Sequence, residues 1–221
     1  MRILFKYTTR GRRDNFLRGI DSIINNVEDK ENYHILISVE NAFHDHKMHP
    51  LPVLNCPHTY NVNPDAPTTK IDAINRDVNE FEYDWDIIIN MSDDMVFHAK
   101  GFDNVIRSYF KEDWGIDTYK SLLFFDGNRS DIITMSILGR KYYDRDKYIY
   151  HPSYKSVYCD NEATDVAKMR GVLVECKEHL FTHLHPSYGK GNMDAQYVHT
   201  ESFYAVDEQN YFNRRIKFFR E

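Results

Sequence analysis

The stretch IIINMSDDMVF, residues 87–97, combines the end of a buried strand with a pair of acidic side chains. Three isoleucines lead directly into the adjacent carboxylates of Asp93 and Asp94, and more apolar residues follow at once. Adjacent carboxylates repel each other, and burying either one costs several kcal/mol unless positive charge lies nearby. A bound divalent cation and a solvated turn are the two arrangements that would relieve this repulsion.

On both sides of this stretch, apolar strand-like segments alternate with segments whose apolar residues recur at helical spacing. Such alternation predicts an α/β fold, with a mostly parallel central sheet flanked by helices. The predicted strands of the first half are residues 2–8, 33–39, 52–56 and 85–91, and the predicted helices are 15–27 and 70–81, capped by Asp14 and Thr69.

The second half of the chain is less regular, and we interpret it as a smaller acceptor-side subregion of the same domain. Its predicted strands are residues 121–127, 132–138, 172–176 and 179–185, and its predicted helices are 101–110, 160–170 and 203–219. The single domain then consists of a nucleotide-sugar-binding half (1–98), an acceptor and catalytic half (99–190) and a C-terminal helical segment (191–221).

The composition excludes several classes of protein. Hydrophobic residues make up 42% of the 221 residues and the formal net charge is −6, which argues for a globular domain and against a nucleic-acid binder. The three cysteines are scattered without a CxxC pair, as expected for reduced thiols in a cytoplasmic protein. We find neither a signal-peptide segment nor an apolar run long enough to span a bilayer.

Three polar loops follow the predicted strands, at residues 8–13, 40–45 and 92–94. Because ligands of parallel sheets bind outside the carboxyl ends of the strands, we expect these loops to converge on a ligand site. The first loop, TTRGRR, lacks the glycine pattern of a dinucleotide fingerprint or a P-loop. A divalent metal held by carboxylates is the alternative way to neutralise a diphosphate.

Four segments, in this order and spacing, resemble the GT-A-fold glycosyltransferases, in particular the family-2-like inverting group with its Rossmann-like sheet. They are YTTRGRR (7–13), KIDAINRDV (70–78), DWDIIINMSDDMVF (84–97) and YCDNEATDVAKMRG (158–171). The resemblance covers residues 2–186. It departs from the family's DxD motif at Ser92, which stands at the first acidic position.

The resemblance implies a role for each polar segment. Asp94 would bind Mn2+ or Mg2+, with His183 or His185 as a further ligand, and Asp93 would contact the donor ribose or the metal through water. Asp160 or Glu162 would be the general base, although both also suit the start of a helix. The remaining implied donor-binding residues are Thr8, Thr9, Arg10, Arg13, Glu40, Lys70 and Asn75.

The implied function is a metal-dependent, inverting glycosyltransferase of the hexosyltransferase type, acting in polysaccharide biosynthesis. Its donor would be a nucleoside-diphosphate sugar, with a UDP-sugar favoured, and its acceptor a saccharide or lipid-linked hydroxyl. The C-terminal segment YFNRRIKFF (211–219) could touch an anionic membrane or pack its aromatic face on the core. The alternatives are a sugar-nucleotide nucleotidyltransferase and a non-catalytic nucleotide- or sugar-binding module on the same fold.

Overall fold

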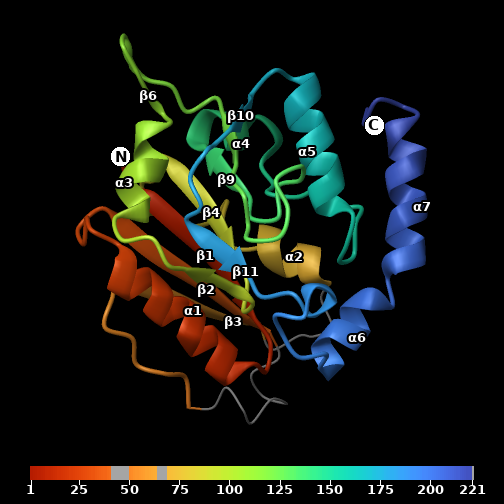
Figure 1. Cartoon of the computed structure of the whole chain (residues 1–221), viewed down its shortest axis with the longest axis horizontal. Coiled ribbons are helices and arrows are strands. Elements are labelled where there is room, and N and C mark those ends of the chain that lie inside the picture. The colour runs from red at the N-terminus through yellow and green to blue at the C-terminus, as the bar shows by residue number, and fades with distance from the viewer. Residues whose placement is uncertain (41–49, 64–68, 221) are drawn as a thin grey trace.

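The computed structural model describes residues 1–40, 50–63 and 69–220 (Figure 1). At its centre lies a seven-stranded sheet in the order β10-β8-β9-β4-β1-β2-β3. The four strands β3, β2, β1 and β4 run parallel, β9 is antiparallel to both of its neighbours, and β10 is parallel to β8. The bounds are β1 (Ile3–Thr9), β2 (Tyr33–Glu40), β3 (His58–Asn63), β4 (Ile87–Met91), β8 (Ser121–Leu123), β9 (Ile137–Gly139) and β10 (Leu173–Glu175).

Helices cover both faces of this sheet, so the predicted Rossmann-like α/β architecture is confirmed (Figure 1). Helices α1 and α3 pack on one face, whereas α2, α4 and α5 pack on the other, and α7 lies against α5. The bounds are α1 (Arg13–Asn26), α2 (Lys70–Asn75), α3 (Phe102–Ser108), α4 (Arg140–Asp146), α5 (Cys159–Met169), α6 (Ala195–Glu201) and α7 (Tyr204–Arg215).

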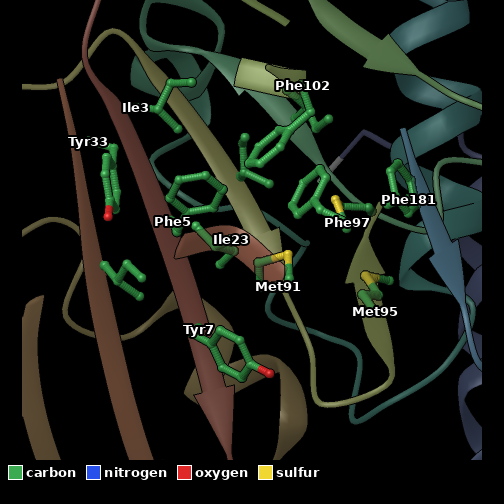
Figure 2. Close-up of a cluster of buried hydrophobic side chains, with 14 of the residues drawn as sticks. Ile3, Phe5, Tyr7, Ile23, Tyr33, Met91, Met95, Phe97, Phe102 and Phe181 are labelled. Carbon is green, nitrogen blue, oxygen red and sulfur yellow. The ribbon is translucent and has the colours of Figure 1, made fainter. Parts of the chain in front are cut away.

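Strand β1 shows why the sheet has two apolar faces. Its side chains alternate between the faces, so Phe5 packs towards α1 and α3 while Leu4 packs towards α2. Figure 2 shows Phe5 beside Phe97 and Phe102, whose stacked rings have centroids 3.7 Å apart. Each fully buried aromatic of this kind contributes about 2 kcal/mol through removal of apolar surface from water. This packing fixes the strands whose ends carry the polar loops.

Two small antiparallel sheets lie outside the main one. β5 (Met95–Phe97) pairs with β11 (Phe181–His183), and β6 (Lys111–Glu112) pairs with β7 (Gly115–Ile116). In the first of these sheets His183 lies opposite Met95. The backbone N–H of Leu184 then donates to the carbonyl of Asp94 at 2.7 Å. This pairing brings a histidine from late in the chain to the acidic pair.

Several of the element predictions are wrong in whole or in part. Residues 52–56 form no strand, and the third strand of the parallel set is β3, whose polar sequence HTYNVN suits an edge position rather than a buried one. Helix α2 ends at Asn75 instead of continuing to residue 81, because Arg76 is extended and Asp77 has a left-handed φ of 71°. The predicted strand at 132–138 is likewise reduced to the short β9.

The C-terminal segment is firmly attached to the domain. Asp207 of α7 is fully buried, and its carboxylate accepts the backbone N–H groups of residues 155–157 at 2.9, 2.7 and 2.9 Å. The predicted helix over 203–219 is α7, which α6 precedes as a separate short helix. None of the helices within the described ranges has the length and apolar character needed to cross a bilayer.

Candidate functional site

The acidic pair lies at the carboxyl end of β4, beside the end of β1. Asp93 is 6% exposed, and the hydroxyl of Thr9 donates to its carboxylate at 3.2 Å. Burial, followed by the negative charge of Asp94, raises the pKa of Asp93 to about 8. Asp93 therefore holds a proton near neutral pH, which removes one of the two adjacent charges.

Asp94 resolves the repulsion in the opposite way. Burial alone would raise its pKa, but the hydrogen bond and charge of His183, the charge of Lys70 and the hydroxyl of Ser92 together lower it well below the usual range. Its Oδ2 lies 3.4 Å from His183 Nε2 and also accepts the hydroxyl of Tyr197, while its Oδ1 accepts the hydroxyl of Ser92. Asp94 is thus the ionised member of the pair.

His183 lies between two carboxylates. Its Nε2 faces Asp94, and its Nδ1 lies 3.5 Å from Asp126 Oδ2. Burial works against the imidazolium, but hydrogen bonds to Asp126 and Asp94 outweigh it and raise the pKa of His183 to about 9. The ring of His185 is 5.2 Å from that of His183, centroid to centroid. The sheet pairing has therefore brought both predicted histidines close to Asp94.

The described residues nevertheless contain no cluster of three or more His, Cys, Asp or Glu side chains arranged to hold a metal ion. Asp94 and His183 supply one carboxylate and one imidazole, a donor set that suits Mn2+. Two protein ligands leave positions for the oxygens of a diphosphate. Of the predicted ligands, Asp94 and His183 form a facing pair, and His185 lies beside His183.

A cavity of about 90 Å³ lies on the β1 side of Asp94. The loops after β1 and β4 both line this cavity, which confirms that they converge. Residues of α6 form a further wall of the cavity. The predicted donor-binding residues that line it are Thr8, Thr9, Arg10, Lys70 and Asp93, and the predicted metal ligand Asp94 lines it too. Thr69 caps α2 through a reciprocal bond with Asp72, which holds Lys70 at the first helical position facing this cavity.

A second cavity, of about 130 Å³, lies on the other side of Lys70 and Asp94. Asp160 lines it from the first turn of α5, together with His183 and Tyr197. Burial raises the pKa of Asp160, against the lowering effect of the positive charge of Lys70. The positive charge of Lys70 thus acts on both the ionised Asp94 and Asp160, whose pKa is raised.

Three predicted site residues lie apart from these cavities. Glu162 accepts two bonds from the guanidinium of Arg214, at 2.7 and 2.8 Å, and one from Tyr154 at 2.7 Å, so its carboxylate is held between α5 and α7. Asn75 is occupied by the backbone of residues 149 and 150. Arg13 donates to the carbonyl of Pro50 at 2.7 Å and lines a neighbouring open groove of about 820 Å³.

One predicted residue cannot be placed. Glu40 ends β2, as expected for a residue at the ligand edge of the sheet, but its side chain lies outside the described residues. The loop at 41–45 that we expect to join the site lies outside them too.

Sequence reasoning missed Arg12, Asp126 and Tyr197. The guanidinium of Arg12 lies 4.5 Å from the ring centroid of Tyr197 and 2.5 Å from a carboxylate oxygen of Asp194, the N-cap of α6. Burial would lower the pKa of Arg12, but its bond to Asp194 raises it. Tyr197 and Asp126 reach the site from 103 and 32 positions away from Asp94, and no local motif marks them.

Comparison with solved structures finds the same fold in proteins of very different sequence. The mannosyltransferase PcManGT from Pyrobaculum calidifontis, in complex with GDP-Man and Mn2+, matches 91% of this chain with a TM-score of 0.59 and 9% identity, over 69% of its own chain. TarS 1–349 from S. aureus in complex with UDP matches 98% with a TM-score of 0.60 and 10% identity, over 72% of that chain.

A longer TarS structure matches the whole of this chain with a TM-score of 0.55 and 13% identity, but the chain spans only 44% of that protein. No protein-family profile and no curated protein sequence matches the chain. At these identities the likeness concerns the fold alone. The chain therefore shares a Rossmann-like fold with these solved proteins.

Proposed function

We propose that the chain is a metal-dependent, inverting glycosyltransferase that uses a nucleoside-diphosphate sugar. The observation that carries the proposal is the facing pair of Asp94 and His183, with Nε2 and Oδ2 separated by 3.4 Å at the junction of two cavities. One cavity is lined by the loop after β1 and the other by Asp160. The proposal assigns the metal to this pair, the donor to the first cavity once α6 has moved, and the general base to the second cavity.

Asp94 and His183 would hold Mn2+ or Mg2+, and the bound ion would screen the negative charge of the diphosphate leaving group. His185 lies close enough to join them when the site is loaded. Lys70 would add positive charge to the diphosphate from the start of α2. Thr8, Thr9, Arg10 and Asp93 would contact the nucleoside.

Asp160 is the proposed general base. It lines the cavity that contains His183 and Lys70, and its raised pKa makes it a stronger proton acceptor for an acceptor hydroxyl. Attack of that hydroxyl on the anomeric carbon, opposite the diphosphate, would invert the configuration. Glu162 is not included, because Arg214 and Tyr154 occupy its carboxylate.

We further propose a UDP-sugar as donor and a saccharide or lipid-linked hydroxyl as acceptor, in polysaccharide biosynthesis in the cytoplasm. The support for the donor class is that the solved proteins of the same fold were captured with UDP, UDP-GlcNAc and GDP-Man. Peripheral membrane contact would use the C-terminal end of α7, where Phe212, Ile216 and Phe218 are exposed beside Arg215 and Lys217.

One observation favours a non-catalytic binding module as the second candidate. Tyr197 of α6 covers Asp94, and the donor-side cavity of about 90 Å³ is too small for a nucleotide sugar unless α6 moves. A transferase would open this cover on binding its donor, whereas a module that binds only a small ligand would keep it closed.

The test measures turnover of UDP- and GDP-sugars in the presence of Mn2+. The readout is the amount of free nucleotide released. We expect Mn2+-dependent turnover that falls at least about 100-fold in Asp94→Ala. Asp113→Ala, which removes an exposed carboxylate in the β6–β7 turn, is the matched control and should turn over as the wild type does. Mn2+-dependent UDP binding without turnover would favour the binding module, and absence of nucleotide binding would overturn both candidates.

A further inference from the structure

Asp126 is a fully buried carboxylate that lines neither of the two cavities at Asp94. We propose that it is a positioning residue of the metal site, which orients His183 so that Nε2 faces the cation held by Asp94. This inference rests on the proposed function, and it concerns a residue that contacts neither metal nor substrate.

The turn at residues 126–129 fixes the carboxylate itself. Asp126 Oδ1 accepts the backbone N–H groups of Asn128 and Arg129, both at 2.7 Å. With Oδ1 held in this way, Oδ2 is directed to His183 Nδ1 at 3.5 Å. A carboxylate whose only duty was to close the turn would need Oδ1 alone. The direction of Oδ2 therefore indicates a second role.

Backbone contacts join the same turn to β11. The N–H of His183 donates to the carbonyl of Asp126 at 2.8 Å, and the amide of Asn128 donates to the carbonyl of His183, also at 2.8 Å. Gly127 has a left-handed φ of 85°, and a Cβ placed on it would lie 3.1 Å from the side chain of Thr182. The turn and the strand are thus in direct contact, which fixes the position of Asp126 relative to His183.

This arrangement decides which imidazole nitrogen can bind a cation. A neutral imidazole carries one N–H and one lone pair. If Nδ1–H donates to Asp126, the lone pair of Nε2 is left facing Asp94, which is the form that a metal requires. Without Asp126, the ring can adopt the other tautomer or rotate, and the cation would lose a correctly oriented ligand.

The experiment measures Mn2+ affinity by titration calorimetry or electron paramagnetic resonance, without turnover. Asp126→Asn retains an oxygen for the turn N–H groups, and we expect it to bind Mn2+ about 10- to 100-fold more weakly than the wild type. Asp131→Asn changes an exposed carboxylate five residues away and should leave the affinity unchanged. Circular dichroism melting checks that both variants are folded.

A double-mutant cycle separates positioning from a structural effect. If Asp126 acts through His183, Asp126→Asn will weaken Mn2+ binding in the wild type but not further in a His183→Ala background. An equal loss in both backgrounds, or wild-type affinity in Asp126→Asn, overturns the inference while leaving the proposed function intact. Absence of Mn2+ binding by the wild-type protein overturns both.

A crystal structure of the wild-type protein with Mn2+ gives a second test that does not depend on the variants folding. The inference requires that His183 bind the ion through Nε2, with Nδ1 within hydrogen-bonding distance of Asp126. A ring that binds through Nδ1, or that turns away from Asp126, contradicts it.

Discussion

At the scale of single residues, Asp160 and Glu162 show how two acids on one helical turn acquire different duties. Asp160 faces the cavity shared with Lys70, whereas Glu162 is held by Arg214 and Tyr154. Sequence position favours both equally, because each suits the first turn of a helix. Only their partners in the folded chain distinguish them.

Asp160→Asn is expected to lower kcat by about 10²- to 10⁴-fold, because the variant cannot accept a proton, while the KM for the donor changes little.

Glu162→Gln is expected to keep the kcat of the folded enzyme but to lower the free energy of unfolding by about 3 kcal/mol, because Arg214 loses its charged partner. Initial rates and urea denaturation measure the two effects. A Glu162→Gln enzyme that is stable yet inactive would reverse the assignment.

At the scale of elements, α6 is a cover over Asp94. Asp194 caps the helix and binds Arg12, and Tyr197 in its first turn donates to Asp94. The metal and the diphosphate of a bound donor would compete for Asp94 and Arg12. On the proposed function, donor binding would open this cover by replacing its contacts.

Tyr197→Phe is expected to strengthen Mn2+ binding in the absence of nucleotide by about 10-fold. The reason is that the ion no longer displaces a hydrogen bond to a carboxylate, which is worth about 1.5 kcal/mol. Titration calorimetry measures this change. Tyr204→Phe, which removes the hydroxyl of an exposed tyrosine at the start of α7, is the control. Unchanged or weaker Mn2+ binding in Tyr197→Phe would show that the phenol does not compete with the metal.

At the scale of the whole molecule, stability depends on pH through a buried ion pair that joins β1 to the end of α2. The side chain of Lys6 is 0% exposed, and its ammonium lies 3.7 Å from Asp77 Oδ2. Burial would raise the pKa of Asp77, but the hydroxyl of Ser38 and the charges of Lys6 and Arg76 lower it. The folded state thus favours the ionised carboxylate more than the unfolded state does.

It follows that this contribution is complete above the unfolded pKa of about 3.9 and is lost as the pH falls through the lower folded value. Asp77→Asn should lower the free energy of unfolding on the order of 3 kcal/mol at pH 7, because it removes a negative charge from beside a buried ammonium. Asn tolerates the left-handed φ at this position, so the backbone is not strained. Urea denaturation at pH 7 and pH 3 should show the difference narrowing at pH 3, and a constant difference would contradict the assignment.

The sequence could predict features that depend on residues close together along the chain. It could not predict contacts between residues that are far apart along the chain. The strands β1, β2 and β4 and the convergence of Thr9 with Asp93 follow from local apolar runs and from the rule that loops meet at strand ends. Strand β3 could not be predicted, because an edge strand needs no apolar run. Asp126 and Tyr197 were missed because tertiary contacts alone select them from the many similar acids and tyrosines of the chain.

The two C-terminal helices, α6 and α7, contact two separate parts of the domain. The first places a phenol on Asp94, and the second supports the loop before α5 through Asp207 and α5 itself through Arg214. A deletion that removes α6 and α7 would remove the cover over Asp94 and also weaken the support of α5, the helix that carries the proposed base. Loss of activity in such a truncated protein would not show which of the two contacts matters. Single-residue substitutions are needed to separate loss of the cover over Asp94 from loss of the support of α5.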